Sequence, residues 1–171
     1  MKFKYCPFLI FLILFLQNHR SFSQYIALIN IDSLYHERGV IFSNEYVLAL
    51  EIEKLERRFT PDIQSIAKAE NLFLNNYNLA NQSNPAGANI KFIESPKNYF
   101  RCFVRQYVGY YDKNGDINIL IHLIDNSRPK KTRKVLGDKW KENFVIFFAQ
   151  PMPLKIMTYN VNLTQRKVSL F

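Results

Sequence analysis

The sequence predicts a single α+β domain in which one helix packs across a curved antiparallel sheet of four to five strands. Three observations support this class. Residues 61–77 show helical periodicity, the chain after residue 88 contains successive strand-like segments, and Asn114-Gly115 joins two of these segments. A helix and a sheet that each have an apolar face bury those faces against each other, which is the α+β arrangement.

The predicted helix has the clearest boundaries. Thr60 supplies an N-cap hydroxyl, Pro61 suits the first helical position, and Asp62 places an acid in the first turn. Apolar side chains then recur on one helical face. They are Ile63, Ile66, Ala67, Phe73, Leu74 and Tyr77. A helix over residues 61–77 is therefore expected, followed by a loop at 81–87.

The segments before the helix are less clearly patterned. Residues 25–31 predict a short strand, and residues 32–39 a polar connection. Residues 45–52 alternate between apolar and polar side chains, which favours a strand. A helical stripe also fits this region, through Leu48, Ile52, Leu55 and Phe59.

The segments after the helix predict the sheet. Residues 99–111 and 117–124 are rich in aromatic and β-branched side chains, and Asn114-Gly115 between them predicts a hairpin with a type I′ turn. Further strands are expected at 144–148, 154–163 and 168–171.

The N-terminus has the layout of a secretory signal peptide. Lys2 and Lys4 precede an apolar run at 8–16, and Ser21 and Ser23 supply small side chains for cleavage. The run is short compared with the roughly 20 residues that a spanning helix needs, so an uncleaved anchor is the lesser alternative. We expect cleavage after Ser23, an exported protein in the periplasm or outside the cell, and a domain comprising residues 24–171.

Composition excludes several classes of protein. The chain has 171 residues, two cysteines and five glycines, so one domain is expected, without a disulfide scaffold or a multi-cysteine zinc ribbon. Removing residues 1–23 takes away three of the 23 bases and none of the 14 acids, so the formal charge falls from +9 to +6. Cys102 is then the remaining thiol, and we expect it to be a small buried side chain.

The sequence offers little that points to catalysis or to a cofactor. Asp112, Asn114 and Asp116 have the spacing that opens a calcium loop, but an apolar strand follows where further ligands would be needed, so a turn is expected. His36 and His122 are far apart in the sequence, and no metal or cofactor site is expected.

Glu70 is the one chemically unusual residue of the helix. It lies within the apolar stripe, where a carboxylate needs a cation or a donor. Arg105 or Arg101 on the nearby strand would serve, so a structural ion pair of Glu70 with Arg105 is the leading interpretation. The alternative is an enzyme with a helix-over-sheet cone, whose pocket would hold Glu70, Arg105 and His122.

A run of bases near the C-terminal third is the leading candidate for a binding site. Such a run is either a solvated loop or a surface for anionic partners. Nucleic acid is not expected, because stacking aromatics are scarce beside the run. The bases are Arg128, Lys130, Lys131, Arg133, Lys134, Lys139 and Lys141.

The segment Arg105-Gln106-Tyr107-Val108-Gly109-Tyr110, together with Thr60-Pro61-Asp62-Ile63, resembles a motif of small bacterial secreted proteins with no assigned activity. The similarity covers about residues 45–125 and implies a cystatin-like α+β shape without catalytic residues. Cystatins present Gln-x-Val-x-Gly on a hairpin tip, whereas here Gln106, Val108 and Gly109 are one residue closer together and fall within a strand.

The sequence therefore predicts an exported, non-catalytic binding or structural module. Its expected partner is an anionic surface or another envelope protein, with no integral membrane span after cleavage. A protease inhibitor or an immunity protein is a further alternative.

Overall fold

The computed structural model describes residues 26–30, 38–48, 57–82, 102–137, 139–146 and 153–171. The expected signal peptide and the residues His36 and Arg101 lie outside these ranges. So do residues 49–52 and 147–148, which belong to two expected strands.

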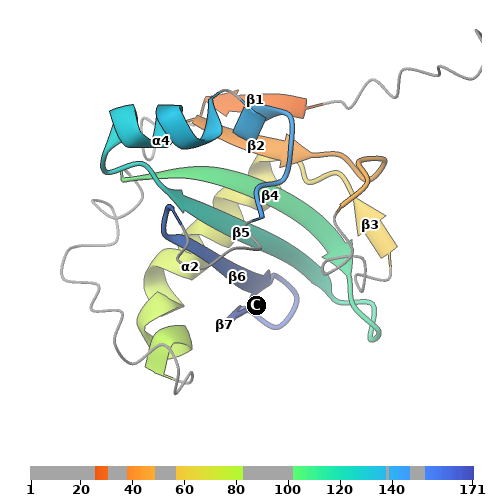
Figure 1. The fold of residues 1–171 in the computed structure, drawn as a ribbon. Helices are drawn as coiled ribbons and strands as arrows, with labels where there is room; N and C mark the ends of the chain where they lie inside the picture. Colours follow the sequence, from red (N-terminus) through yellow and green to blue (C-terminus); the bar gives the residue numbers. More distant parts are fainter. Residues whose placement is uncertain (1–25, 31–37, 49–56, 83–101, 138, 147–152) are drawn as a thin grey trace, which may run out of the picture.

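The described chain forms one mixed sheet with helices on both sides (Figure 1). The strand order is β1-β2-β4-β5-β6-β7, and β3 pairs with β4 beside this path. The strands are β1 Ile26–Asn30, β2 Arg38–Phe42, β3 Arg57–Phe59, β4 Phe103–Tyr111, β5 Ile117–Asp125, β6 Ile156–Asn162 and β7 Lys167–Leu170. The helices are α2 Ile63–Gln82, α4 Pro129–Leu136 and the 3₁₀ turn η3 Lys139–Lys141.

The α+β class is confirmed, but the purely antiparallel sheet of four to five strands and the single helix are wrong. Within the described residues the sheet has seven strands, and β2 runs parallel to β4 with Gly39 opposite Arg105 and Phe42 opposite Val108. The short strand β3 then pairs antiparallel with the other half of the same β4 edge. Two segments thus share one edge of β4.

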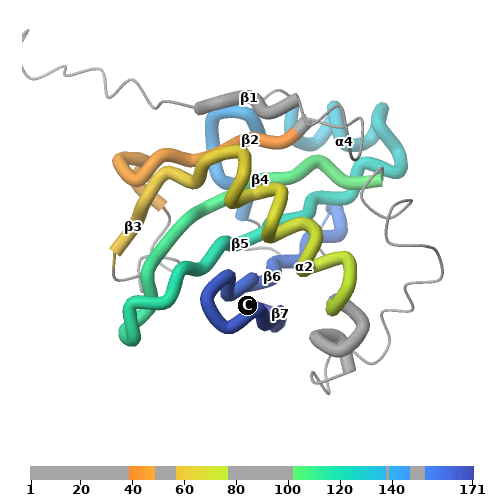
Figure 2. The backbone as a smooth tube through the Cα atoms, turned by 180° about the vertical axis from the view of Figure 1, so that it is seen from behind, coloured from red at the N-terminus to blue at the C-terminus, as the bar shows by residue number. Residues whose placement is uncertain are grey.

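Both faces of the sheet are covered. Helix α2 lies across one face, and α4 lies on the opposite side, as Figures 1 and 2 show from front and back. The α2-side core includes Ile66, Phe73 and Tyr159, and the α4-side core includes Phe42, Leu136 and Trp140. Because the central strand β5 has layers on both sides, it is buried from residue 118 to residue 124.

Helix α2 begins slightly later than expected. Its cap is Asp62, whose Oδ1 accepts the Ser65 backbone N–H at 2.6 Å, and this bond lowers the pKa of Asp62. Thr60, the expected N-cap, instead donates its hydroxyl to the Asn44 side-chain oxygen at 2.9 Å. The helix also continues beyond the expected end, to Gln82.

The β4–β5 hairpin is confirmed, but the type I′ turn is wrong. The Gly115 N–H donates to Asp112 O at 2.9 Å, and the Asp112 N–H donates to Asp116 O at 3.1 Å. Gly115 has a φ of 82°, whereas Arg166 is the sole described non-glycine residue with positive φ, so Asn114 has negative φ. This is a type I turn followed by a left-handed glycine, which forms a three-residue hairpin loop.

Other sequence expectations are also corrected. Strand β2 includes residues 38 and 39, which the sequence places in a polar connection, and residues 45–48 form a turn and a bend without a strand. Residues 144–146 are not a strand either. Cys102 lies just before β4 and is half-buried against the α2-side core.

Candidate functional site

The basic run at 128–134 is not a loop, because residues 129–136 form helix α4. Pro129 suits its first turn, and at the other end the Gly137 N–H donates to Arg133 O at 2.8 Å, with Gly137 in a left-handed conformation. Thr132 and Leu136, one turn apart, are buried on the sheet side. These two positions fix which side of the helix faces the protein, so the remaining positions project outward.

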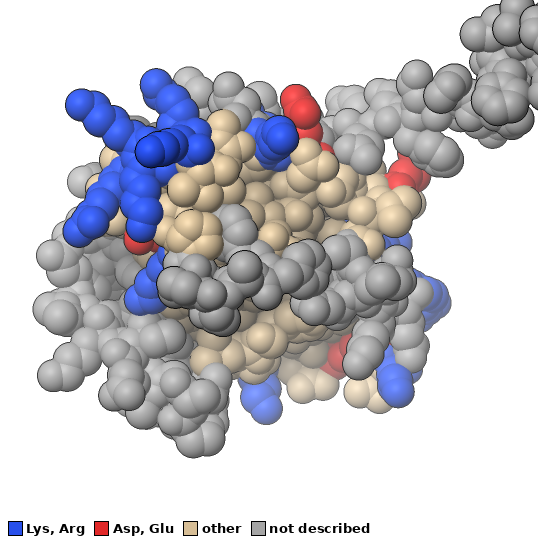
Figure 3. Space-filling model, viewed as in Figure 1, with Lys and Arg blue, Asp and Glu red and all other residues tan. Residues whose placement is uncertain are grey.

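Four of the six exposed positions of α4 are cationic, and Arg128 at the N-cap adds a fifth base. We define the α4 cationic face as Arg128, Lys130, Lys131, Arg133 and Lys134, all of which are exposed. Figure 3 shows these bases gathered over α4 as the densest cluster of positive charge on this side of the molecule. Among the described residues, no carboxylate forms an ion pair with any of the five. The face therefore presents positive charge to solvent.

The two remaining predicted bases do not belong to this face in the same way. Lys139 is exposed in the next turn, whereas Lys141 is half-buried with its ammonium 5.9 Å from the centre of the Trp140 ring. That geometry is a cation–π contact, which gives Lys141 a local structural role.

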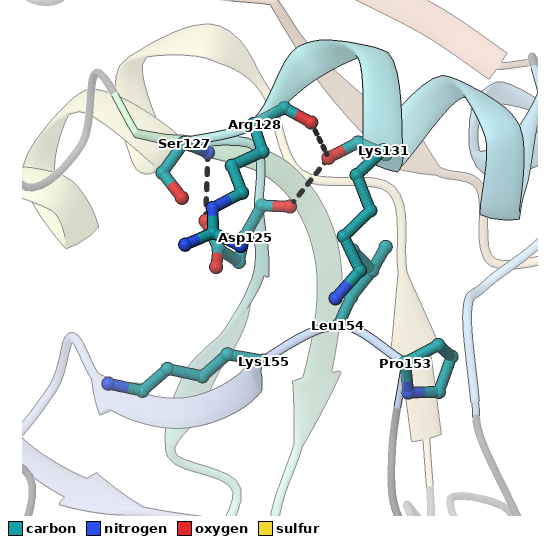
Figure 4. Close-up of a pocket in the computed structure, with 8 residues that line it drawn as sticks. Asp125, Ser127, Arg128, Lys131, Pro153, Leu154 and Lys155 are labelled. Carbon is teal, nitrogen blue, oxygen red and sulfur yellow. Dashed lines mark hydrogen bonds between the residues drawn. The ribbon is translucent and has the colours of Figure 1, made fainter.

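A hollow of about 280 Å³ lies at the start of α4 (Figure 4). Arg128 and Lys131 reach from α4 toward the segment that carries Leu154, and Lys155 extends from that same segment. The lining is completed by Asp125, Ser127, Thr132 and Pro153. Three cations and one carboxylate thus surround a single concavity. We call it the α4 hollow.

Hydrogen bonds hold the α4 hollow to the end of β5. The Thr132 hydroxyl donates to the Asp125 carbonyl at 3.0 Å, and Asp125 Oδ1 accepts the Ser127 N–H at 2.8 Å. The Asp125 N–H donates to the Lys155 carbonyl at 2.8 Å. These bonds tie the backbone around the hollow to the sheet.

A second hollow of about 320 Å³ separates α2 from the β6–β7 turn. It is lined by Lys68, Asn71, Leu72, Asn75, Leu163 and Arg166. Its lining contains two cations, Lys68 and Arg166. Among the described residues, no hydrogen bond links these two side chains to a shared partner.

Glu70 and Arg105 lie on the α2 side of the sheet as a fully buried ion pair. Arg105 donates to Glu70 Oε1 at 2.8 Å, and the Tyr107 hydroxyl donates to the same oxygen. Burial raises the pKa of Glu70, while Arg105 and Tyr107 lower it part of the way back. Both side chains of the ion pair are 0% exposed, so the carboxylate has no access to a substrate. The pair can hold α2 against β4.

His122 lies on the opposite face of the sheet from this pair. In the β4–β5 register Arg105 faces Leu123, and His122 faces Gln106. The His122 Nε2–H donates to Val145 O at 2.9 Å, and Nδ1 accepts from Thr158 at 2.7 Å. Burial lowers the pKa of His122 to about 4, so the ring is neutral near pH 7. The sheet therefore keeps His122 out of any pocket with Glu70 and Arg105.

The other sequence candidates have structural positions. Gln106, Val108 and Gly109 are buried inside the central strand β4, so they cannot be presented on a hairpin tip as cystatins present theirs. The Asp112 carboxylate accepts the backbone N–H groups of Asn114 and Asp116 within its own turn. Within the described ranges, no group of His, Cys, Asp or Glu is placed to hold a metal ion.

Sequence reasoning missed Asp125 and Lys155 as part of the site. Lys155 is remote from the basic run, and only the pairing of β5 with β6 brings it beside α4. No pattern in the sequence marks that contact.

Comparison with known proteins supplies no family: no family model, curated protein or solved structure matches the chain. Among the helices in the described ranges, none is both long and apolar enough to cross a bilayer.

Proposed function

We propose that the protein is an exported, non-catalytic module that docks on an anionic lipid surface through the α4 cationic face. The observation that carries this proposal is the presence of five exposed bases on one short helix and its N-cap, none of them paired with a described carboxylate. A cluster of four to eight bases on an amphipathic helix is the pattern that binds acidic lipid headgroups.

The expected affinity is modest. Each base near an anionic membrane contributes about 1 kcal/mol, and salt screens the attraction over about 10 Å at 0.1 M. Val135, 36% exposed among the bases, adds an apolar side chain suited to the headgroup region. Docking should therefore fade between low and physiological salt.

A catalytic role receives less support from the site. Glu70 and Arg105 are sealed beneath α2, and His122 is sealed beneath the segment after η3. The cystatin-like description is itself a proposal: α2 across the sheet fits it, while α4 and the parallel strand β2 depart from it. In the part of the chain that the structure describes, no geometric feature favours the inhibitor or immunity alternative.

Co-sedimentation with vesicles tests the docking proposal. The full chain should bind phosphatidylglycerol vesicles more than phosphatidylcholine vesicles at low salt, and the comparison cancels any contribution of the apolar segment at 8–16. The triple variant K130E/R133E/K134E should lose this difference. The variant K68E/K113E/K167E makes the same charge change at exposed positions outside the face, and it should retain most of the difference. Equal losses in both variants would show that net charge, and not the face, drives binding.

The export proposal has its own measurement. The intact mass of the protein recovered from the expressing cell should lack residues 1–23. A mass that retains them would favour a membrane anchor.

A further inference from the structure

We infer that the α4 hollow binds a phosphomonoester group. The inference rests on the proposed function, because it names the headgroup chemistry that this part of the surface recognises. It is carried by the composition of the helix start and by the side chains that line the hollow.

Apart from Pro129, the start of α4 lacks the features that normally stabilise a helix N-terminus. Arg128 at the N-cap makes no side-chain cap hydrogen bond, and the first turn contains no acid. Instead, Arg128, Lys130 and Lys131 place positive charge at the positive end of the helix dipole. Residues that destabilise their own element are expected at functional sites. A bound anion would offset the repulsion between these bases and the helix dipole.

The lining of the hollow matches a small anion with several oxygens. Arg128 offers a planar guanidinium that can donate two parallel bonds, while Lys131 and Lys155 offer compact point charges. The three come from two segments far apart in the sequence, α4 and the approach to β6 (Figure 4). The volume of about 280 Å³ is near the lower end of ligand pockets, which suits a headgroup better than a large molecule.

Asp125 identifies which anion fits best. Its carboxylate lines the hollow with the three cations and repels a ligand that has no proton to donate, such as sulfate or a phosphodiester. A phosphomonoester has a second pKa of about 6 and can keep one hydroxyl, which donates to a carboxylate. Three cations and one carboxylate therefore favour a phosphomonoester over sulfate and over a phosphodiester.

Calorimetry on the full chain with glycerol 3-phosphate and sodium sulfate tests the selectivity. We expect the phosphomonoester to bind at least about tenfold more tightly than sulfate, the ratio that one charge-assisted hydrogen bond supports. Asp125→Asn keeps an oxygen that accepts the Ser127 N–H but removes the negative charge. It should strengthen sulfate binding and so reduce the ratio of the two affinities. Equal affinities for the two anions in the unmodified protein would overturn the inference.

Charge-matched variants test the location. R128Q/K155Q removes two cations from the hollow and should weaken glycerol 3-phosphate binding at least about tenfold. K130Q/K134Q removes two cations outside the lining and should change the affinity by less than about threefold. Equal losses would show that the hollow is not the site. If R128Q/K155Q fails to fold, the exposed single variant Lys155→Gln makes the same comparison with Lys130→Gln.

Vesicles distinguish the source of the phosphate and separate the two proposals. At matched surface charge, preference for phosphatidic acid over phosphatidylglycerol that is lost in R128Q/K155Q identifies a lipid headgroup. Binding of glycerol 3-phosphate without that lipid preference identifies a soluble phosphorylated molecule instead. Phosphatidylglycerol binding with no monoester preference in solution or on vesicles overturns this inference alone. Monoester binding with no vesicle binding overturns the docking proposal alone.

Discussion

At the scale of single residues, the stability of the fold depends on the buried ion pair of Glu70 and Arg105. Removing one member leaves the other charged and desolvated, which costs about 3–5 kcal/mol in buried pairs. We therefore expect Glu70→Gln and Arg105→Met each to lower the free energy of unfolding strongly. The double variant should lose less than the sum of the two, because no orphaned charge remains. Urea denaturation of all four proteins gives the coupling, and additive losses would contradict it.

His122 makes the stability depend on pH. Its pKa is about 4 in the folded protein and 6.5 in the unfolded chain, so the unfolded chain binds more protons between these values. The stability that the neutral ring contributes is present above pH 6.5 and is lost as the pH falls toward 4. The loss amounts to about 3 kcal/mol, from 1.36 kcal/mol per pKa unit.

The variant His122→Gln isolates this dependence. It cannot titrate in this range, so its free energy of unfolding should fall less than that of the unmodified protein between pH 7 and pH 4.5. Urea denaturation at both pH values measures the difference. Parallel changes in the two proteins would show that His122 is not the titrating group. Glu70 has the opposite effect on stability, because a raised carboxyl pKa favours the folded state at low pH. Both proteins contain Glu70, so its contribution does not affect the comparison.

At the scale of elements, the β4–β5 hairpin depends on the left-handed glycine of its turn. A Cβ added to Gly115 would meet no atom within 4 Å, so a substitution there tests backbone conformation without a clash. Gly115→Val should cost more than about 1 kcal/mol, because β-branched residues resist positive φ. Gly115→Asn should cost less, because Asn tolerates that region. Thermal melting of the two variants gives the comparison, and equal losses would contradict the turn assignment.

The elements that could be predicted are those whose signal is local. Helix α2 was predicted because its apolar residues recur at helical spacing, and the hairpin because turn residues separate two strand-like runs. Strand β2 was missed because its stability comes from pairing with β4, more than 60 positions further along the chain. Helix α4 was missed because a helix of eight residues with two buried positions shows almost no periodicity.

At the scale of the whole molecule, one part of the candidate site can be predicted from the sequence and the other cannot. The bases of the α4 cationic face are visible in the sequence as a run, because neighbours on one short helix are also neighbours in the chain. The α4 hollow is not visible, since Asp125 ends one strand and Lys155 precedes another. Likewise the separation of His122 from Glu70 follows from strand register, which composition does not reveal. The positive charge of the site can therefore be predicted from the sequence, whereas the α4 hollow forms only when the fold brings Asp125 and Lys155 beside α4.

The α4-side layer is tied to the sheet by side chains, because the described residues 139–146 include no strand. The Gln106 side-chain amide donates to Trp140 O at 2.6 Å and to Asn143 O at 2.8 Å, and its oxygen accepts the Val145 N–H at 3.0 Å. These bonds satisfy backbone groups that burial would otherwise leave without partners. Gln106 thus makes three of the hydrogen bonds that anchor this outer segment, beside the bond of His122 to Val145 O and that of the Phe144 N–H to the Tyr46 hydroxyl.

This anchoring predicts that the layer unfolds together with the sheet. Trp140 is the single tryptophan of the chain and is buried in this layer, so its fluorescence reports on the layer while far-UV circular dichroism reports on the whole fold. In urea the two signals should share one midpoint. Gln106→Leu removes the amide and leaves buried backbone groups unpaired, at about 1–3 kcal/mol for each group. The Trp140 midpoint of this variant should therefore fall below its circular dichroism midpoint. Separate midpoints in the unmodified protein, or a shared midpoint in the variant, would mean that Gln106 does not couple the layer to the sheet.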